Sequence, residues 1–116
     1  MAGIWGVQPS SPITLNSQSV AYTTTAADAN DGVLHPTADN NARTFTIDSN
    51  ANVPYPMGTT LMFVNQINTV TIAITSDTLT LSPGGGTGSR TLAAAGIATA
   101  LKVSATNWVI SGFGLT

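Results

Sequence analysis

The clearest pattern of apolar and polar residues lies in residues 58–81. Residues 61–64 are apolar at every position, whereas residues 69–75 alternate Val and Ile with Thr and Ala. A period of two and many β-branched side chains indicate strands, because such side chains pack well on a pleated sheet. We expect a hairpin here, with the polar residues 65–68 as its turn and the two apolar rows packed against each other.

The two strands of this stretch differ in their outer surfaces. The first is apolar on both faces, which predicts a central position in the sheet. The second has one apolar face and one threonine face, which is typical of a strand with one side in water.

Shorter alternating patterns predict further strands, at residues 20–25, 33–35, 43–48, 97–104 and 108–113. Residues 26–32 predict a short helical turn that ends at an Asp-Gly pair. Alanine favours helix in residues 91–100, but Gly96 opposes it, so we expect a strand only from Ile97. Residues 19–116 are therefore expected to form one all-β domain, an antiparallel β-sandwich or barrel of the jelly-roll kind.

Residues 1–18 differ from the rest of the chain. Two prolines hold the backbone extended, and the segment still carries apolar residues, namely Ile4, Trp5, Val7, Ile13 and Leu15. One interpretation is a first strand packed on its own domain. The other is an extended N-terminal arm that docks on a neighbouring chain, with these five residues as its partner contacts.

Charged residues make up 7% of the chain, against about 25% in an average soluble domain. This composition fits a protein whose surface is partly covered in an assembly, and it equally fits a threonine-rich β protein. A net charge of −2 without a basic cluster argues against nucleic acid as a partner. We expect no membrane-spanning helix, no secretion signal and, without cysteine, no disulfide.

Candidate chemistry is sparse. A catalytic set would have to use His35, the single histidine, which we expect to be a partly exposed residue at a strand end. Residues 28–32 suggest a calcium loop, but Asp39 occupies the place of the bidentate glutamate. The glycine-rich residues 82–90 lack the lysine of a phosphate loop. We therefore expect no enzyme activity, no cofactor and no metal.

Several short motifs recur in a characteristic order along residues 21–112. They are Ala21-Tyr22-Thr23 with Ala27-Asp28-Ala29, then Arg43-Thr44-Phe45-Thr46-Ile47, then Val53-Pro54-Tyr55-Pro56-Met57-Gly58-Thr59, then Val70-Thr71-Ile72, and finally Ala100-Leu101-Lys102 with Asn107-Trp108-Val109-Ile110-Ser111-Gly112. This series resembles a small β domain of tailed-phage virion proteins, which occurs in fibre, spike and head-decoration proteins.

The resemblance implies a non-enzymatic virion protein, often a homotrimer. Because only a short arm precedes the domain, we expect a decoration or cement protein on the outer surface of the capsid, bound to the major capsid protein. The alternative is a receptor-binding or carbohydrate-binding module of a tail fibre or spike. In that case Tyr55, Trp108 or the glycines at 84–88 would be the contacts.

Overall fold

The computed structural model describes residues 12–116, which form nine strands and one short 3-10 helix. The elements are β1 (Leu15–Ser17), β2 (Tyr22–Thr23), η1 (Ala26–Asp28), β3 (Gly32–His35), β4 (Arg43–Ile47), β5 (Thr60–Asn65), β6 (Val70–Ile74), β7 (Thr78–Leu81), β8 (Arg90–Ser104) and β9 (Asn107–Leu115).

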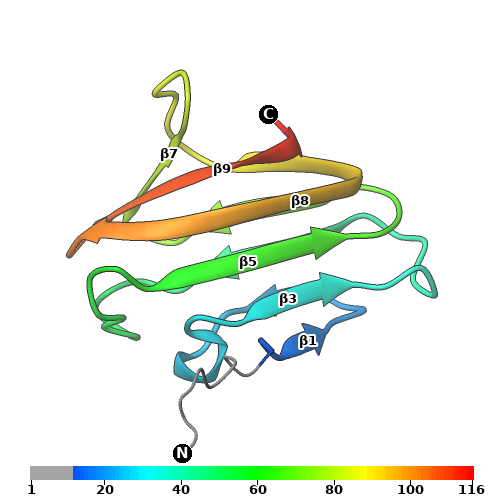
Figure 1. Ribbon diagram of the computed structural model, residues 1–116, viewed down its shortest axis with the longest axis horizontal. Coiled ribbons are helices and arrows are strands. Elements are labelled where there is room, and N and C mark those ends of the chain that lie inside the picture. The colour runs from blue at the N-terminus through cyan, green and yellow to red at the C-terminus, as the bar shows by residue number, and fades with distance from the viewer. Residues whose placement is uncertain (1–11) are drawn as a thin grey trace, which may run out of the picture.

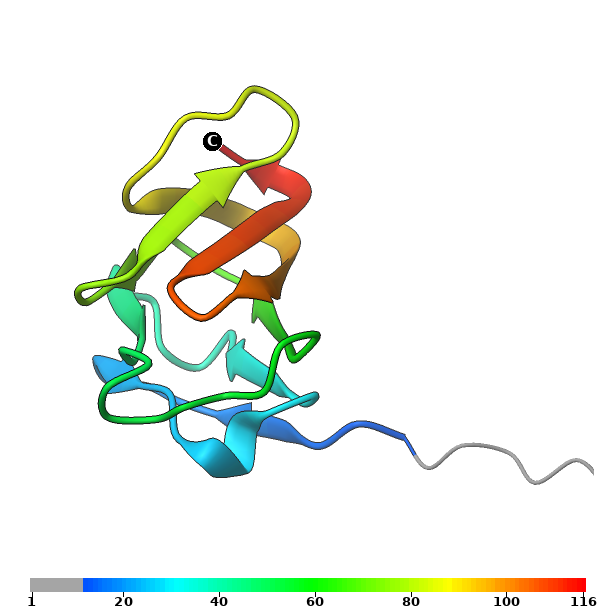
Figure 2. The ribbon, with the colours of Figure 1, turned by 90° about the vertical axis from the view of Figure 1, so that its left-hand side faces the viewer.

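The first six strands form two layers, because the chain crosses from one layer to the other after each strand. Strands β1, β3 and β5 pair side by side in parallel, and we call them the odd layer. Strands β2, β4 and β6 form a second parallel set, the even layer. Figure 1 looks onto the odd layer, and Figure 2 shows the same chain turned by a quarter. This arrangement is that of a short solenoid, in which each coil stacks on the previous one.

The long strand β8 joins the two layers. Its residues 90–92 pair with β6, and its residues 96–101 pair with β5, antiparallel in both cases. The corner between these segments includes Ala95, whose φ of 63° lies in the left-handed region. Strand β9 runs antiparallel along β8, and β7 pairs in parallel with β9.

Two glycines allow β8 and β9 to approach closely. A Cβ atom at Gly112 would overlap the carbonyl oxygen of Ile97 and lie 2.5 Å from the Cα of Ala98. A Cβ atom at Gly96 would lie 2.9 Å from the carbonyl oxygen of Phe113. Any larger residue at either position would therefore push the two strands apart.

The core lies between the layers and is made of inward-facing side chains of both. Phe63 on β5 and Phe45 on β4 are fully buried, as is Trp108 on β9. Burial of each large apolar side chain contributes about 1.5–3 kcal/mol relative to exposure. The other buried apolar residues are Val33, Ile47, Tyr55, Leu61, Val70, Ile72, Leu79, Leu92, Ala98, Ala100 and Ile110.

The all-β fold expected from the sequence is confirmed, but its strand pairing differs. Antiparallel pairing is confined, among the strands of residues 12–116, to β8 and its neighbours. The described chain is thus a solenoid-like stack in which β8 pairs with the last strand of each layer and β9 pairs with β8, rather than the expected jelly-roll sandwich or barrel.

The prediction of a hairpin at residues 58–75 is wrong. Both of its strands exist, but β8 lies between β5 and β6 in the sheet. The reason is that residues 65–68 form a corner between layers, so the apolar rows meet across the core instead of along a hydrogen-bonded pair. The alanine-rich segment is also strand from Arg90 onward, earlier than expected.

The expected arm, residues 1–18, falls partly outside the described part. Three of the five candidate contacts, Ile4, Trp5 and Val7, lie outside the described residues. Within the remainder, Leu15–Ser17 form β1, which pairs with β3.

Candidate functional site

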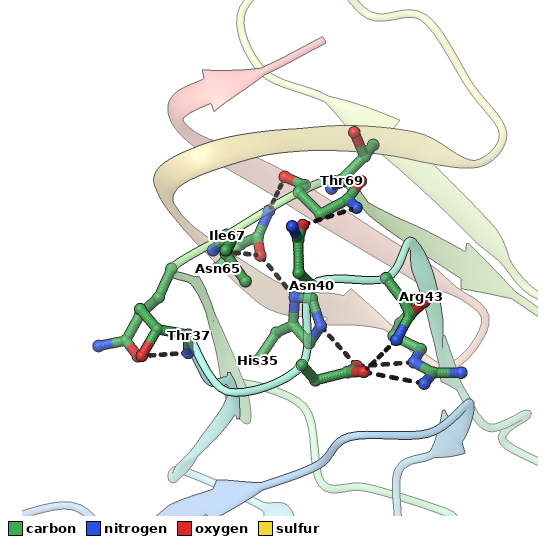
Figure 3. A network of polar contacts seen from close by, with 11 residues as sticks. His35, Thr37, Asn40, Arg43, Asn65, Ile67 and Thr69 are labelled. Atoms are coloured by element: carbon green, nitrogen blue, oxygen red, sulfur yellow. Dashed lines mark hydrogen bonds and ion pairs between the residues drawn. The ribbon is translucent and has the colours of Figure 1, made fainter.

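A buried polar network at one corner of the stack contains the groups that most resemble a catalytic set (Figure 3). His35 is fully buried, with Nδ1 2.8 Å from Oδ1 of Asn65 and Nε2 2.9 Å from Oδ2 of Asp39. The Nδ2 group of Asn65 donates to the backbone carbonyls of Asn68 and Leu92. The parallel register of β3 and β5 brings His35 and Asn65 side by side.

Asp39 links this histidine to the even layer. Arg43, the first residue of β4, donates from Nε and a terminal nitrogen to the two oxygens of Asp39, at 2.7 and 2.9 Å. Asn41 donates to the same carboxylate at 2.6 Å. The hydrogen bonds from Arg43 and then Asn41 hold the pKa of Asp39 well below its usual range.

The network ties corners of the fold together. Among residues 12–116, the side chains bonded to His35 and Asp39 are carboxylate, amide and guanidinium groups, with no hydroxyl or thiol. The expectation of a partly exposed His35 is wrong, although it does end a strand. Its partners Asp39 and Asn65 are four and thirty residues away in the sequence, and only the register of β3 with β5 brings Asn65 close to His35.

A polar cleft of about 370 Å³ lies at the first coil, beside η1. Asp28 accepts hydrogen bonds there from the Tyr22 hydroxyl at 2.6 Å, the Thr25 amide at 2.8 Å and the Asn16 side chain at 3.1 Å. Burial and the bond to Asp28 raise the pKa of Tyr22. Across residues 12–116, no three acidic, His or Cys side chains gather in a way that could hold a metal ion.

The aromatic residues considered for glycan contact are in the core. Trp108 is 0% exposed and Tyr55 is 4% exposed, and their rings pack edge to face at 5.5 Å. The ammonium group of Lys102 lies about 6 Å from each ring and donates to Asn50 and to the Tyr55 carbonyl. These two aromatic rings are therefore not available as a sugar platform.

The remaining candidate is the outer surface of the odd layer together with β8 and β9. Strand register places its outward residues in rows, of which one runs Ser17, Leu34, Val64, Ile97 and Phe113. We call the apolar members of these rows, with Val103 of β8, the apolar face: Leu15, Leu34, Met62, Val64, Ile97, Leu101, Val103, Val109 and Phe113.

Solvent reaches much of this apolar face. Ile97, on β8 at the centre of the apolar face, is 48% exposed. Phe113, on β9 at the far edge of the face, is 90% exposed. The charged residue of this part of β8, Lys102, points inward and is buried. Contiguous exposed apolar surface of this kind marks an interaction site in soluble proteins.

The apolar face includes Leu15 and extends to Ile13, the two arm contacts that are described. A Cβ atom on Gly32 would lie 2.7 Å from Cδ2 of Leu15 and 3.6 Å from Cδ1 of Ile13. Both side chains thus lie over Gly32 at the β1 edge, and both remain partly exposed.

The sequence analysis assigned Ile13 and Leu15 to partner binding but missed the larger face beside them. A signal was present, since the strand at residues 60–65 is apolar on both sides. One side packs in the core, and the other forms the middle of the apolar face. Residues such as Ile97 and Phe113 join it only through the pairing of β5, β8 and β9.

Within the described residues, no helix has the length and apolar character needed to cross a membrane. Comparisons of the chain with protein-family models, with curated proteins and with solved structures found no match.

Proposed function

We propose that this protein is a capsid decoration protein of a tailed phage, a homotrimer that binds the major capsid protein on the outer surface of the head. The observation that carries the proposal is the uncharged apolar face, which continues into Ile13 and Leu15 at the base of the arm. A surface of this kind suits a protein that works inside an assembly. The motif resemblance supplies the class of assembly.

The mechanism is stabilisation by mass action. A protein that binds only the assembled lattice lowers the free energy of that lattice by its own binding free energy. Several copies held together raise the effective concentration of each further contact. In this proposal the residues from Ile4 to Leu15 reach the capsid, and the β domain acts as the compact body that projects from it.

Two of the residues considered as contacts for the alternative function, a glycan-binding fibre tip, are not accessible to a glycan. Tyr55 and Trp108 are buried, which leaves the glycine-rich loop at residues 84–88. That loop is held by backbone bonds from Gly85 to Leu81 and from Gly88 to Leu79. No specific feature of the loop favours sugar binding, so we retain decoration as the proposal.

The test is binding of the recombinant protein to purified virions, followed by electron microscopy of the mixture. Ordered density over the head is the expected result. Bare heads with density only at the tail would move the assignment to the fibre, and no density on the particles would overturn both.

The arm assignment is tested by removing residues 1–11, which leaves β1 intact. Binding should be lost while the circular dichroism spectrum stays unchanged, because the deleted residues precede the sheet. Ile13→Ser should also weaken binding, and Val20→Ser provides a matched control because Val20 is a similarly exposed aliphatic outside the face. Full binding by the shortened chain would remove the arm from the proposal.

A further inference from the structure

Phe113 and a groove on the same face form a matching pair of features. Phe113 projects from β9 and is 90% exposed. On the other side of Ile97 lies an open groove of about 400 Å³, lined by Thr37, Val64, Asn65, Gln66, Ala95, Gly96 and Ile97. The register Val64–Ile97–Phe113 places the projecting ring and the groove about two strand spacings apart on one surface.

We propose that the apolar face binds a second copy of this chain, with Phe113 of one copy seated in the groove of the next. The groove is large enough for one aromatic side chain, and its wall toward β8 is formed by Ala95, Gly96 and Ile97. A two-fold axis near Ile97 would place each Phe113 over the partner's groove.

The chemistry of the surface favours a copy of itself. The apolar face meets an identical face without burying an unpaired charge, because Lys102 points into the core. A charged partner surface would lose hydration on docking here and gain no ion pair. The outward residues that accompany the apolar ones are small and hydroxylated, namely Ser17, Thr60, Thr99 and Ser111, so two sheets can pack closely.

The size of the face sets the expected strength. Five strands about 4.8 Å apart and five to six residues of length give a plane of roughly 400 Å². Stable complexes bury about 800 Å² per partner, so this contact alone gives weak association. Self-association should therefore depend on concentration.

Sedimentation velocity of the full chain over a range of concentrations tests the inference. We expect the mass to rise from one copy to two as the concentration increases. Ile97→Lys should weaken association at least about tenfold, because it places a charge at the centre of the contact. Thr44→Lys, an exposed outward position on the even layer, should leave association unchanged.

Because the chain has no cysteine, a single introduced thiol gives a second and independent measurement. Ile97→Cys should form a disulfide-linked dimer under mild oxidation, since the two copies bring residue 97 close to the symmetry axis. Thr44→Cys should remain monomeric on the same gel. Circular dichroism of each variant checks that the fold is retained.

The inference is independent of capsid binding. A wild-type chain that stays monomeric at every concentration overturns it, as does equal cross-linking of Ile97→Cys and Thr44→Cys. A mass of two copies supports the inference and removes the homotrimer from the proposed function. A mass of three copies without a dimer overturns the two-fold contact, whereas the virion experiment decides decoration alone.

Discussion

The two outer faces of the protein are built on the same strand geometry but carry different side chains. The odd layer with β8 and β9 presents the apolar face, centred on Val64 and Ile97. The even layer with the start of β8 presents a threonine face, which consists of Thr23, Thr44, Thr46, Thr71 and Thr91 with Ala73 among them. Both sets lie in register across neighbouring strands.

The difference shows which part of the pattern the fold requires. Inward positions are buried in both layers, for example Phe45 in one and Phe63 in the other. Outward threonine keeps the β-branched shape that suits a strand while its hydroxyl bonds to water. The fold therefore does not need outward Ile or Phe, and their presence on one face supports the contact with a second copy proposed for it.

The largest expected effect comes from separating β9 from β8, because β9 contributes both to the apolar face and, through Trp108 and Ile110, to the core. In Gly112→Val the new side chain would overlap the Ile97 carbonyl and the Ala98 backbone. We expect a loss of about 3 kcal/mol or more in the free energy of unfolding, measured by urea denaturation.

Gly86→Ala is the control for that substitution. Its Cβ atom would meet only the end of the flexible Arg90 side chain, at 3.3 Å. Its free energy of unfolding should change by less than about 0.5 kcal/mol. Equal losses in the two variants would contradict the close approach of β8 and β9.

A second way to test the comparison is to weaken the polar network around Asp39, which joins the odd and even layers. Because the pKa of Asp39 is lower in the folded than in the unfolded protein, its stabilising effect is complete above the unfolded value of about 4. That effect is lost as the pH falls through the folded value. Thermal unfolding midpoints should therefore drop as the pH is lowered below about 4.

Arg43→Gln separates this effect from general acid sensitivity. The variant removes the strongest hydrogen bonds to Asp39, so the pKa of Asp39 should move back toward its usual value. We expect lower stability at neutral pH and a smaller further loss on acidification than in the wild type. An unchanged acid profile would show that Asp39 does not carry it.

The smallest expected effect comes from two substitutions that give one outward residue of each face the kind of side chain found on the other face. Thr44→Val and Ile97→Thr each alter one outward side chain, so each should change the free energy of unfolding by no more than about 1 kcal/mol. Their effects on self-association should differ, with Ile97→Thr weakening it and Thr44→Val leaving it unchanged. Sedimentation and urea unfolding of the same samples measure both quantities.

The sequence predicts which residues point inward better than it predicts which strands pair. Alternation correctly located β5 and β6, the central position of β5 and the threonine side of β6. Pairing depends on contacts between distant segments, such as Gly32 with Met62, for which periodicity carries no signal. A polar corner such as residues 65–68 also has the same composition as a hairpin turn.

The candidate site was predictable in part for the same reason. Ile13 and Leu15 stand out as apolar residues in a polar, proline-containing segment. Ile97 and Phe113 do not stand out, because each is one apolar residue in an ordinary strand until β8 places them beside Val64. The buried state of His35 likewise follows from the parallel register with Asn65.

The position of β8 between β5 and β6 also governs the order in which the chain can fold. The last strand of each layer keeps an open, unpaired edge until residues 90–101 arrive from the C-terminal part of the chain. These contacts join segments far apart in sequence, and loop closure makes such steps slow. During synthesis the edges of β5 and β6 will therefore stay open until β8 has been made, and the stack can be completed only after that.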